Sequence, residues 1–222
     1  MLTLAYSIVV LSITASIASA YLYKYANKKE KVFIYYIISI GFFELLAILL
    51  EMVMNNGNNL PGLHLYTLFQ FVILTFFFNS CLREISDWFK YKWVITIGSI
   101  GIIANSIFFQ SIFTYNSYSK SAVELYIILM SLTLFTFFLR DKTHDQVNMK
   151  ASVSFVSAVF LQSAVSIIFY IYSNDILEMK ASLRDLIWYL RIAINYISLF
   201  MIIFGMWQIF NRKKEIINPA KI

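Results

Sequence analysis

Seven long apolar runs, separated by short polar connections, constrain this chain more than any other feature of its sequence. Crossing the roughly 30 Å hydrocarbon core of a bilayer takes about 20 mostly apolar residues in a helix. The runs that meet this requirement are residues 2–23, 32–53, 64–82, 93–113, 121–139, 151–172 and 185–210. They are continuously apolar and too long for the alternating strands of a membrane barrel. The sequence therefore predicts an all-α polytopic membrane protein with seven transmembrane helices.

The composition agrees with a chain that lies mostly in lipid. Apolar residues make up 60% of the sequence and charged residues 14%, whereas about 25% of the residues in an ordinary soluble protein are charged. A soluble domain of this length has too little interior to bury so much apolar surface. The expected partner is the lipid bilayer, and the net charge of +6 indicates orientation in that bilayer, with no nucleic acid expected.

The orientation follows from where the basic residues lie. Three of them, Lys120, Lys180 and Arg184, fall on one side of the predicted bundle. Fourteen fall on the other side: Lys24, Lys28, Lys29, Lys31, Arg83, Lys90, Lys92, Arg140, Lys142, Lys150, Arg212, Lys213, Lys214 and Lys221. Because cytoplasmic connections are enriched in Lys and Arg, we expect the N-terminus outside and the C-terminus in the cytoplasm. Residues 1–210 would form the bundle in the cell membrane, and residues 211–222 a short basic cytoplasmic tail.

The first apolar run has an alternative interpretation as a secretory signal. Ala18, Ser19 and Ala20 resemble the small residues of a cleavage site after an apolar core. However, no Lys or Arg precedes the run, whereas a signal peptide begins with a basic segment. We therefore expect a first transmembrane helix, and cleavage would leave six.

Charged side chains inside the predicted spans are the most function-like feature. An ionisable group at mid-helix in a bilayer costs about 2.5–3.5 kcal/mol and tends to face the bundle interior with a partner. Glu44, Glu51, Glu124 and Arg191 all fall in the outer halves of their predicted spans. Glu44 and Glu51 are seven residues apart, which places them on one helix face. The cytoplasmic halves are expected to hold few polar groups.

These positions predict an outward-facing polar cavity that binds a small ligand. Trp188, Arg191 and Asn195 share one face of the last span, and His64 and Tyr66 follow the Pro61-Gly62 turn at the start of the third. The predicted ligand-binding residues are Glu44, Glu51, His64, Tyr66, Glu124, Trp188, Arg191 and Asn195.

Structural alternatives stay open for several of these residues. Arg191 could instead form an ion pair that fixes helix packing, with a partner among Glu44, Glu51, Glu124 and Asp185. Glu44 could be a neutral helix contact, and His64 an interfacial residue. Small residues at four-residue spacing, as at Ser12, Ser16 and Ala20, and the ridge Gly98, Gly101 and Ala104 permit close helix packing. They would act within the bundle or in a homodimer.

Several classes of chemistry lack their motifs. The sequence has no glycine-rich phosphate loop and no H-E-x-x-H pair, and two His with one Cys argue against a zinc site. No catalytic residue, metal or cofactor is predicted. The span number and orientation resemble those of microbial rhodopsins and G-protein-coupled receptors. Retinal binding requires a Lys in the last span, and residues 185–210 contain none.

Residues 58–67, Asn-Asn-Leu-Pro-Gly-Leu-His-Leu-Tyr-Thr, precede an apolar helix. This segment is similar to a group of uncharacterised seven-transmembrane-helix bacterial membrane proteins. The resemblance covers a minor part of the chain, implies the same seven-helix fold and assigns no activity. Heavy use of Ile, Phe, Tyr, Lys and Asn is also typical of an AT-rich bacterial genome.

The sequence predicts a sensor- or receptor-like bundle. Because its tail is short, we expect the ligand-binding signal to pass to a separate cytoplasmic partner. One alternative is a small-solute or proton-coupled carrier, in which Glu44 or Glu51 exchanges protons. A carrier needs a polar path through the cytoplasmic half, which the sequence barely provides. A further alternative is a lipid-active enzyme or a structural assembly subunit, although we favour a non-enzymatic role.

Overall fold

The computed structural model describes residues 2–53, 59–83, 90–140, 146–172, 176 and 179–217. Across those residues the chain is helical and contains no strand. The helices are α1 (Leu2–Leu22), α2 (Lys28–Val53), α3 (Leu60–Leu82), α4 (Tyr91–Ala104), α5 (Ser117–Arg140), α6 (Gln146–Ile171) and α8 (Ala181–Ile217), with a 3-10 turn at Tyr23–Tyr25 and a π-helical turn at Asn105–Phe109. Seven described helical segments are long and apolar enough to cross a membrane. The prediction of an all-α chain with seven candidate spans is confirmed.

Helix starts follow from local sequence chemistry. At α2, the backbone N–H of Asn27 donates to Glu30 Oε2 at 2.8 Å, and the N–H of Glu30 donates to Asn27 Oδ1 at 3.0 Å. This reciprocal arrangement is a capping box, which satisfies N–H groups that have no partner within the helix. At α3, Pro61 occupies the first turn, where its missing N–H costs nothing.

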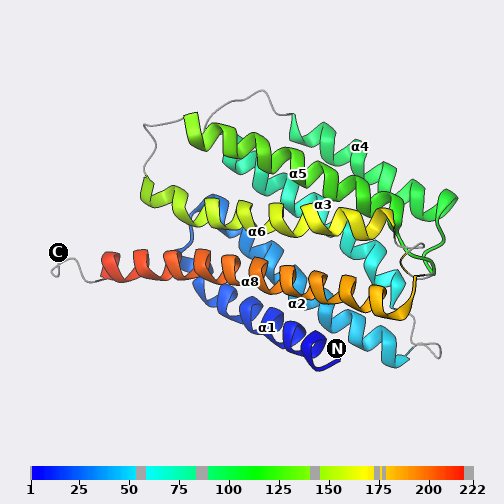
Figure 1. Cartoon of the computed structure of the whole chain (residues 1–222). Helices are drawn as coiled ribbons and strands as arrows, with labels where there is room; N and C mark the ends of the chain where they lie inside the picture. The colour runs from blue at the N-terminus through cyan, green and yellow to red at the C-terminus, as the bar shows by residue number, and fades with distance from the viewer. Residues whose placement is uncertain are drawn as a thin grey trace.

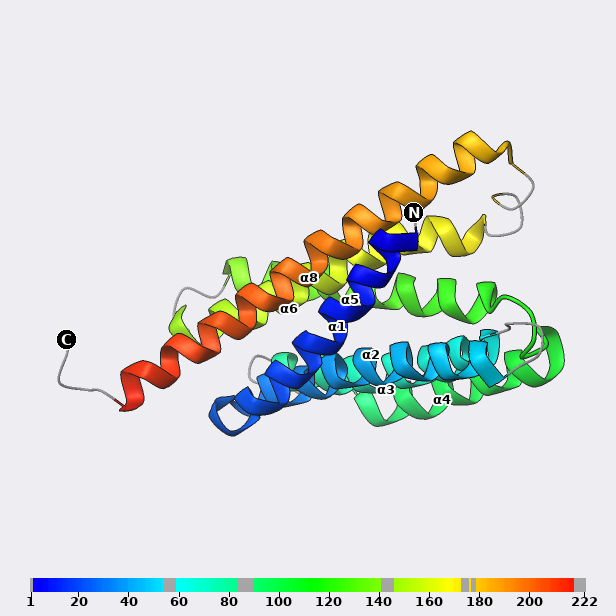
Figure 2. The same cartoon turned by 90° about the horizontal axis from the view of Figure 1, so that it is seen from below.

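The helices lie side by side, with α4 at one edge and α1 at the other (Figure 1). Helix α8 packs on α6 and α1, α2 packs on α1 and α3, and α5 packs on α3 and α6. Helix α4 packs on α3, and only 6% of its apolar segment is buried. The view from below shows α6 and α8 on one side of the bundle and α3 and α4 on the other (Figure 2). A lipid environment explains why the exposed face of α4 is apolar.

Small residues allow close approach within the bundle. Ser16 on α1 is buried and donates a hydrogen bond to the carbonyl of Ile37 on α2 at 2.7 Å. A Cβ at Gly41 would collide with Ser16, and one at Gly98 would collide with the ring of Phe71. Ser16 and Gly98, two of the small residues singled out by their spacing, therefore serve packing inside one chain, whereas a Cβ at Gly101 would meet no atom within 4 Å. The homodimer stays a prediction.

Several helix boundaries differ from those expected. The fourth helical segment ends at Phe109 rather than at residue 113, because a π-helical turn closes it. Helix α5 begins at Ser117, so Lys120 lies within a helix and is 2% exposed. The expectation that Lys120 belongs to an outer connection was wrong. Helix α8 continues to Ile217, so much of the segment expected as a tail is helical.

One half of the bundle contains a cluster of buried aromatic side chains. We call this half the basic end; it contains the start of α2, the end of α3 and the start of α6. Phe33 stacks on Phe155 with ring centroids 4.2 Å apart, and Phe77 lies 4.9 Å from Phe33. All three side chains are fully buried. A Cβ at Gly205 would lie 2.5 Å from the Phe155 ring, so α8 approaches α6 closely at this level.

A buried ion pair also lies at the basic end. The guanidinium of Arg212 on α8 pairs with Glu30 Oε2 on α2, and Glu30 is fully buried. Sequence inspection had placed the buried charges in the other half, and Glu30 corrects that expectation. Arg212 reaches Glu30 because α8 extends past the span expected for it.

Candidate functional site

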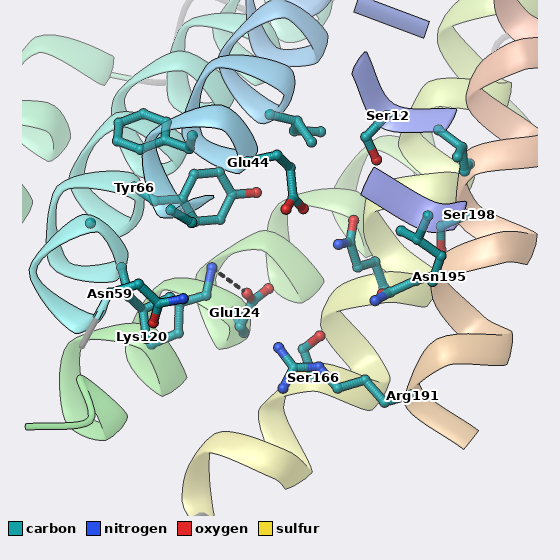
Figure 3. Close-up of a pocket in the computed structure, with 18 of the residues that line it drawn as sticks. Ser12, Glu44, Asn59, Tyr66, Lys120, Glu124, Ser166, Arg191, Asn195 and Ser198 are labelled. Atoms are coloured by element: carbon teal, nitrogen blue, oxygen red, sulfur yellow. Dashed lines mark ion pairs between the residues drawn. The ribbon is translucent and has the colours of Figure 1, made fainter. Parts of the chain in front are cut away.

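A cavity of about 380 Å³ lies between α1, α2, α3, α5, α6 and α8, in the half of the bundle opposite the aromatic core. We call this half the cavity end. Its described lining combines four charged side chains, Glu44, Lys120, Glu124 and Arg191, with the amide-bearing residues Asn59, Gln162 and Asn195 and three tyrosines, Tyr66, Tyr115 and Tyr170. Figure 3 shows the labelled polar groups facing a common space. Asn59, at the rim beside α3, is exposed.

A buried ion pair on α5 forms one wall. Lys120 Nζ lies 2.9 Å from Glu124 Oε1, one helical turn away, and both residues are 2% exposed. The same ammonium donates to Gln70 Oε1 on α3. It also lies 4.7 Å from the ring centre of Tyr66 and 5.5 Å from that of Tyr170. An ammonium over an aromatic face is stabilised by the ring quadrupole, so Lys120 is held by two helices besides its own, α3 and α6.

Arg191 on α8 forms the opposite wall. Its guanidinium donates to the hydroxyl of Tyr170 at 3.1 Å and lies 5.2 to 5.5 Å from the ring centres of Trp188, Phe169 and Tyr170. Among the described residues it forms no ion pair. The arginine is therefore oriented by aromatic faces and a hydroxyl, and its charge has no carboxylate within 4 Å in this part of the chain.

Glu44 on α2 reaches the cavity between these two walls (Figure 3). Its neighbour Tyr66 is positioned by the Tyr36 hydroxyl at 3.5 Å and by a ring contact with Phe43 at 5.4 Å. Glu44 makes no ion pair within the described segments. The cavity thus contains a carboxylate and a guanidinium that form no ion pair within 4 Å with a described residue.

A polar network fixes the chain segment between the π-turn and α5, next to the cavity. His64 contacts Ser106 Oγ at 2.8 Å and the carbonyl of Thr114 at 3.1 Å. The amide of Asn116 donates to Thr67 Oγ1 at 3.2 Å. These contacts join α3 to the segment that carries Tyr115 into the cavity wall.

Five of the eight predicted ligand-binding residues line this one cavity: Glu44, Tyr66, Glu124, Arg191 and Asn195. They come from α2, α3, α5 and α8, so the fold brings together positions that are up to 151 residues apart in the sequence. The role in ligand binding stays a prediction. Their convergence supplies the geometry that such a role requires.

The other three predicted residues lie outside the lining. Glu51 is exposed in the last turn of α2, seven residues past Glu44. His64 is 5% exposed and uses both ring nitrogens in the polar network of the neighbouring segment. Trp188 packs beside the guanidinium of Arg191 and the ring of Phe169, so it supports Arg191.

Sequence inspection missed Lys120, Tyr115 and Tyr170. Lys120 carried a usable signal, because it precedes Glu124 by four residues and would face it on a helix. Tyr115 and Tyr170 carried none, because they are two of 15 tyrosines in an aromatic-rich chain. Among the described residues, no group of three His, Cys, Asp or Glu side chains could hold a metal ion.

Comparison of the chain with protein-family models, curated proteins and solved structures finds no match. Inferences about function therefore depend on the cavity itself.

Proposed function

We propose that this chain is a multi-pass membrane receptor or sensor that binds a small polar ligand in the cavity. The observation that supports it best is the contrast between the two halves of the bundle. Charged groups surround a hollow at the cavity end, whereas at the basic end Phe33 contacts both Phe77 and Phe155, and all three side chains are fully buried. A ligand that enters such a cavity can be bound and released without crossing the protein.

The distribution of basic residues supports an outward-facing cavity. Arg212 and the connections rich in Lys belong to the basic end, and a cytoplasmic basic end would expose the cavity end to the outside. The ligand signal would then be read from the cytoplasmic ends of the helices by a partner protein. The Glu30–Arg212 pair lies there and joins α2 to α8, two helices that also line the cavity.

A carrier requires a polar pathway through both halves in turn. The fully buried aromatic cluster gives no support for one, because opening it would break packing among at least three helices. Arg191 as a purely structural ion pair also finds little support, because it forms no ion pair with a described carboxylate.

Ligand-induced stabilisation tests this proposal. The purified chain in detergent is heated with each of a panel of free amino acids, monosaccharides and small mono- and dicarboxylates, and unfolding is followed by tryptophan fluorescence. A ligand at 100 times its Kd stabilises the folded state by about 2.7 kcal/mol. We expect one compound class to raise Tm. Arg191→Ala should abolish the shift, and Arg184→Ala, on the same helix outside the cavity, should retain it.

Uptake separates receptor from carrier. Proteoliposomes containing the chain should bind the stabilising compound at the surface without accumulating it. Accumulation that Arg191→Ala abolishes would overturn the receptor proposal in favour of a carrier. Where Arg191→Ala does not fold, Arg191→Lys keeps the charge but loses the planar fork and should weaken binding in the folded protein.

A further inference from the structure

The charges around the cavity balance. Its described lining contains two cations, Lys120 and Arg191, and two carboxylates, Glu44 and Glu124. Burying an uncompensated net charge within a membrane protein is costly. A ligand with no net charge therefore fits this cavity better than an anion or a cation.

Only one of the two cations in the lining forms an ion pair with one of the two carboxylates. Lys120 is engaged by Glu124 and by Gln70. Arg191 and Glu44 have no opposite charge within 4 Å among the described residues. The lining consequently presents one positive group and one negative group that form no ion pair with a described residue. Figure 3 shows Arg191 pointing into the space from one side and Glu44 from another.

The positive group suits an oxyanion. A guanidinium has five N–H donors in a planar fork that matches a carboxylate or phosphate. The Tyr170 hydroxyl accepts one of these N–H groups at 3.1 Å, and Tyr115 also lines the cavity. Aromatic rings at 5.2 to 5.5 Å hold the guanidinium plane in place. Donors remain for a ligand oxyanion.

The negative groups suit an N–H donor. Glu124 is 2% exposed, and while its Oε1 contacts Lys120, its Oε2 is buried without a hydrogen-bond partner. A buried acceptor without a partner is costly and marks a place where a ligand donor would be stabilised. Glu44 supplies a second carboxylate, and Figure 3 shows Glu44 and Glu124 facing the same space. An ammonium with N–H groups satisfies both, and a quaternary ammonium cannot.

We propose that the occupant is a small zwitterion whose carboxylate or phosphate binds Arg191 and whose primary ammonium binds Glu44 and Glu124. This inference rests on the proposed ligand-binding function. The cavity of about 380 Å³ is near the lower end of the size range of small-molecule sites. A free amino acid carries this chemistry, and so does the headgroup of an ethanolamine phospholipid.

Binding of matched analogues to the purified full chain tests the proposal. In phospholipid-free detergent, the 20 standard amino acids and glycerophosphoethanolamine are each titrated by isothermal calorimetry. The best binder is compared with its N-acetyl, N-trimethyl and carboxamide analogues, or with the N-trimethyl analogue of the phosphodiester. Each blocked analogue should bind at least 10-fold more weakly. Glu44→Gln should weaken the parent zwitterion by at least 10-fold, and Glu51→Gln, an exposed control, should leave it unchanged.

The two sources are separated in nanodiscs. If the free amino acid is the ligand, discs of phosphatidylcholine with and without phosphatidylethanolamine give the same Kd for it. If the lipid headgroup is the ligand, phosphatidylethanolamine raises Tm of the wild type but not of Glu44→Gln. The inference is overturned if no zwitterion binds, or if a blocked analogue binds as tightly as its parent. If a blocked analogue binds as tightly as its parent and Arg191→Ala abolishes its binding, the zwitterion inference fails but the proposed receptor function is still supported.

Discussion

Removing either member of the buried Lys120–Glu124 pair should have unequal consequences for stability. Lys120→Met strands Glu124, because Oε1 loses the ammonium at 2.9 Å and Oε2 already has no partner. A stranded charge in a transmembrane helix costs about 2.5–3.5 kcal/mol. Glu124→Gln leaves the ammonium bonded to Gln70 and beside the rings of Tyr66 and Tyr170. Each ring contact contributes about 1 kcal/mol, so the two rings together offset about 2 kcal/mol of the cost of leaving Lys120 without a counter-ion. Glu124→Gln should therefore lower the free energy of unfolding by only about 1 kcal/mol.

The free energy of unfolding is measured by titrating SDS into mixed micelles and following tryptophan fluorescence. Lys120→Met should destabilise the fold by about 3 kcal/mol, and the double variant should recover about 2 kcal/mol of that loss, because no charge is stranded. Lys180→Met and Glu51→Gln, both at exposed positions, serve as matched controls. Equal losses of unfolding free energy for the two single variants, or a larger loss for Glu124→Gln, would refute the reasoning that Lys120 keeps stabilising partners without Glu124 whereas Glu124 keeps none without Lys120.

Substitutions at two positions, Gly205 and Glu30, test the basic end. Gly205→Ala should lower the yield of folded protein on size-exclusion chromatography, since its Cβ would lie 2.5 Å from the buried Phe155 ring. Gly101→Ala meets no atom within 4 Å and should leave the yield unchanged, so similar losses would contradict the packing described. Glu30→Gln should keep the capping contact with Asn27 while losing the charge, and Glu30→Ala should cost about 1 kcal/mol more. Equal unfolding free energies for the two Glu30 variants would show that the cap contributes nothing.

The fold was predictable because span length and apolarity are local properties. A run of about 20 apolar residues specifies a membrane-crossing helix whatever its neighbours are, and all seven runs correspond to helical segments. Boundaries were less predictable. Lys120, in the first turn of α5, contacts Gln70 and Tyr66, which lie 50 and 54 residues earlier in the chain, and a local stretch of sequence does not reveal such contacts.

The candidate site was predictable where a charge interrupted an apolar run. Glu44, Glu124 and Arg191 were conspicuous for that reason, and all three line the cavity. Glu51 gave the same signal yet is exposed, because depth along a helix decides whether neighbouring helices cover a side chain. Glu30 lies among lysines and resembled a loop residue, although the spacing Asn27-x-x-Glu30 is typical of a helix start.

Cysteine accessibility tests most directly whether the cavity opens only at the end opposite the basic residues. In a Cys81→Ala background, Asn195→Cys places a thiol in the cavity lining, and Ala158→Cys places one in the fully buried interior of α6. A membrane-impermeant anionic thiosulfonate is added to intact cells or to inside-out vesicles. The receptor proposal predicts labelling of the thiol at position 195 in intact cells alone and no labelling at position 158. Labelling at position 195 from the cytoplasmic face, or from neither face, would contradict an outward-facing ligand cavity.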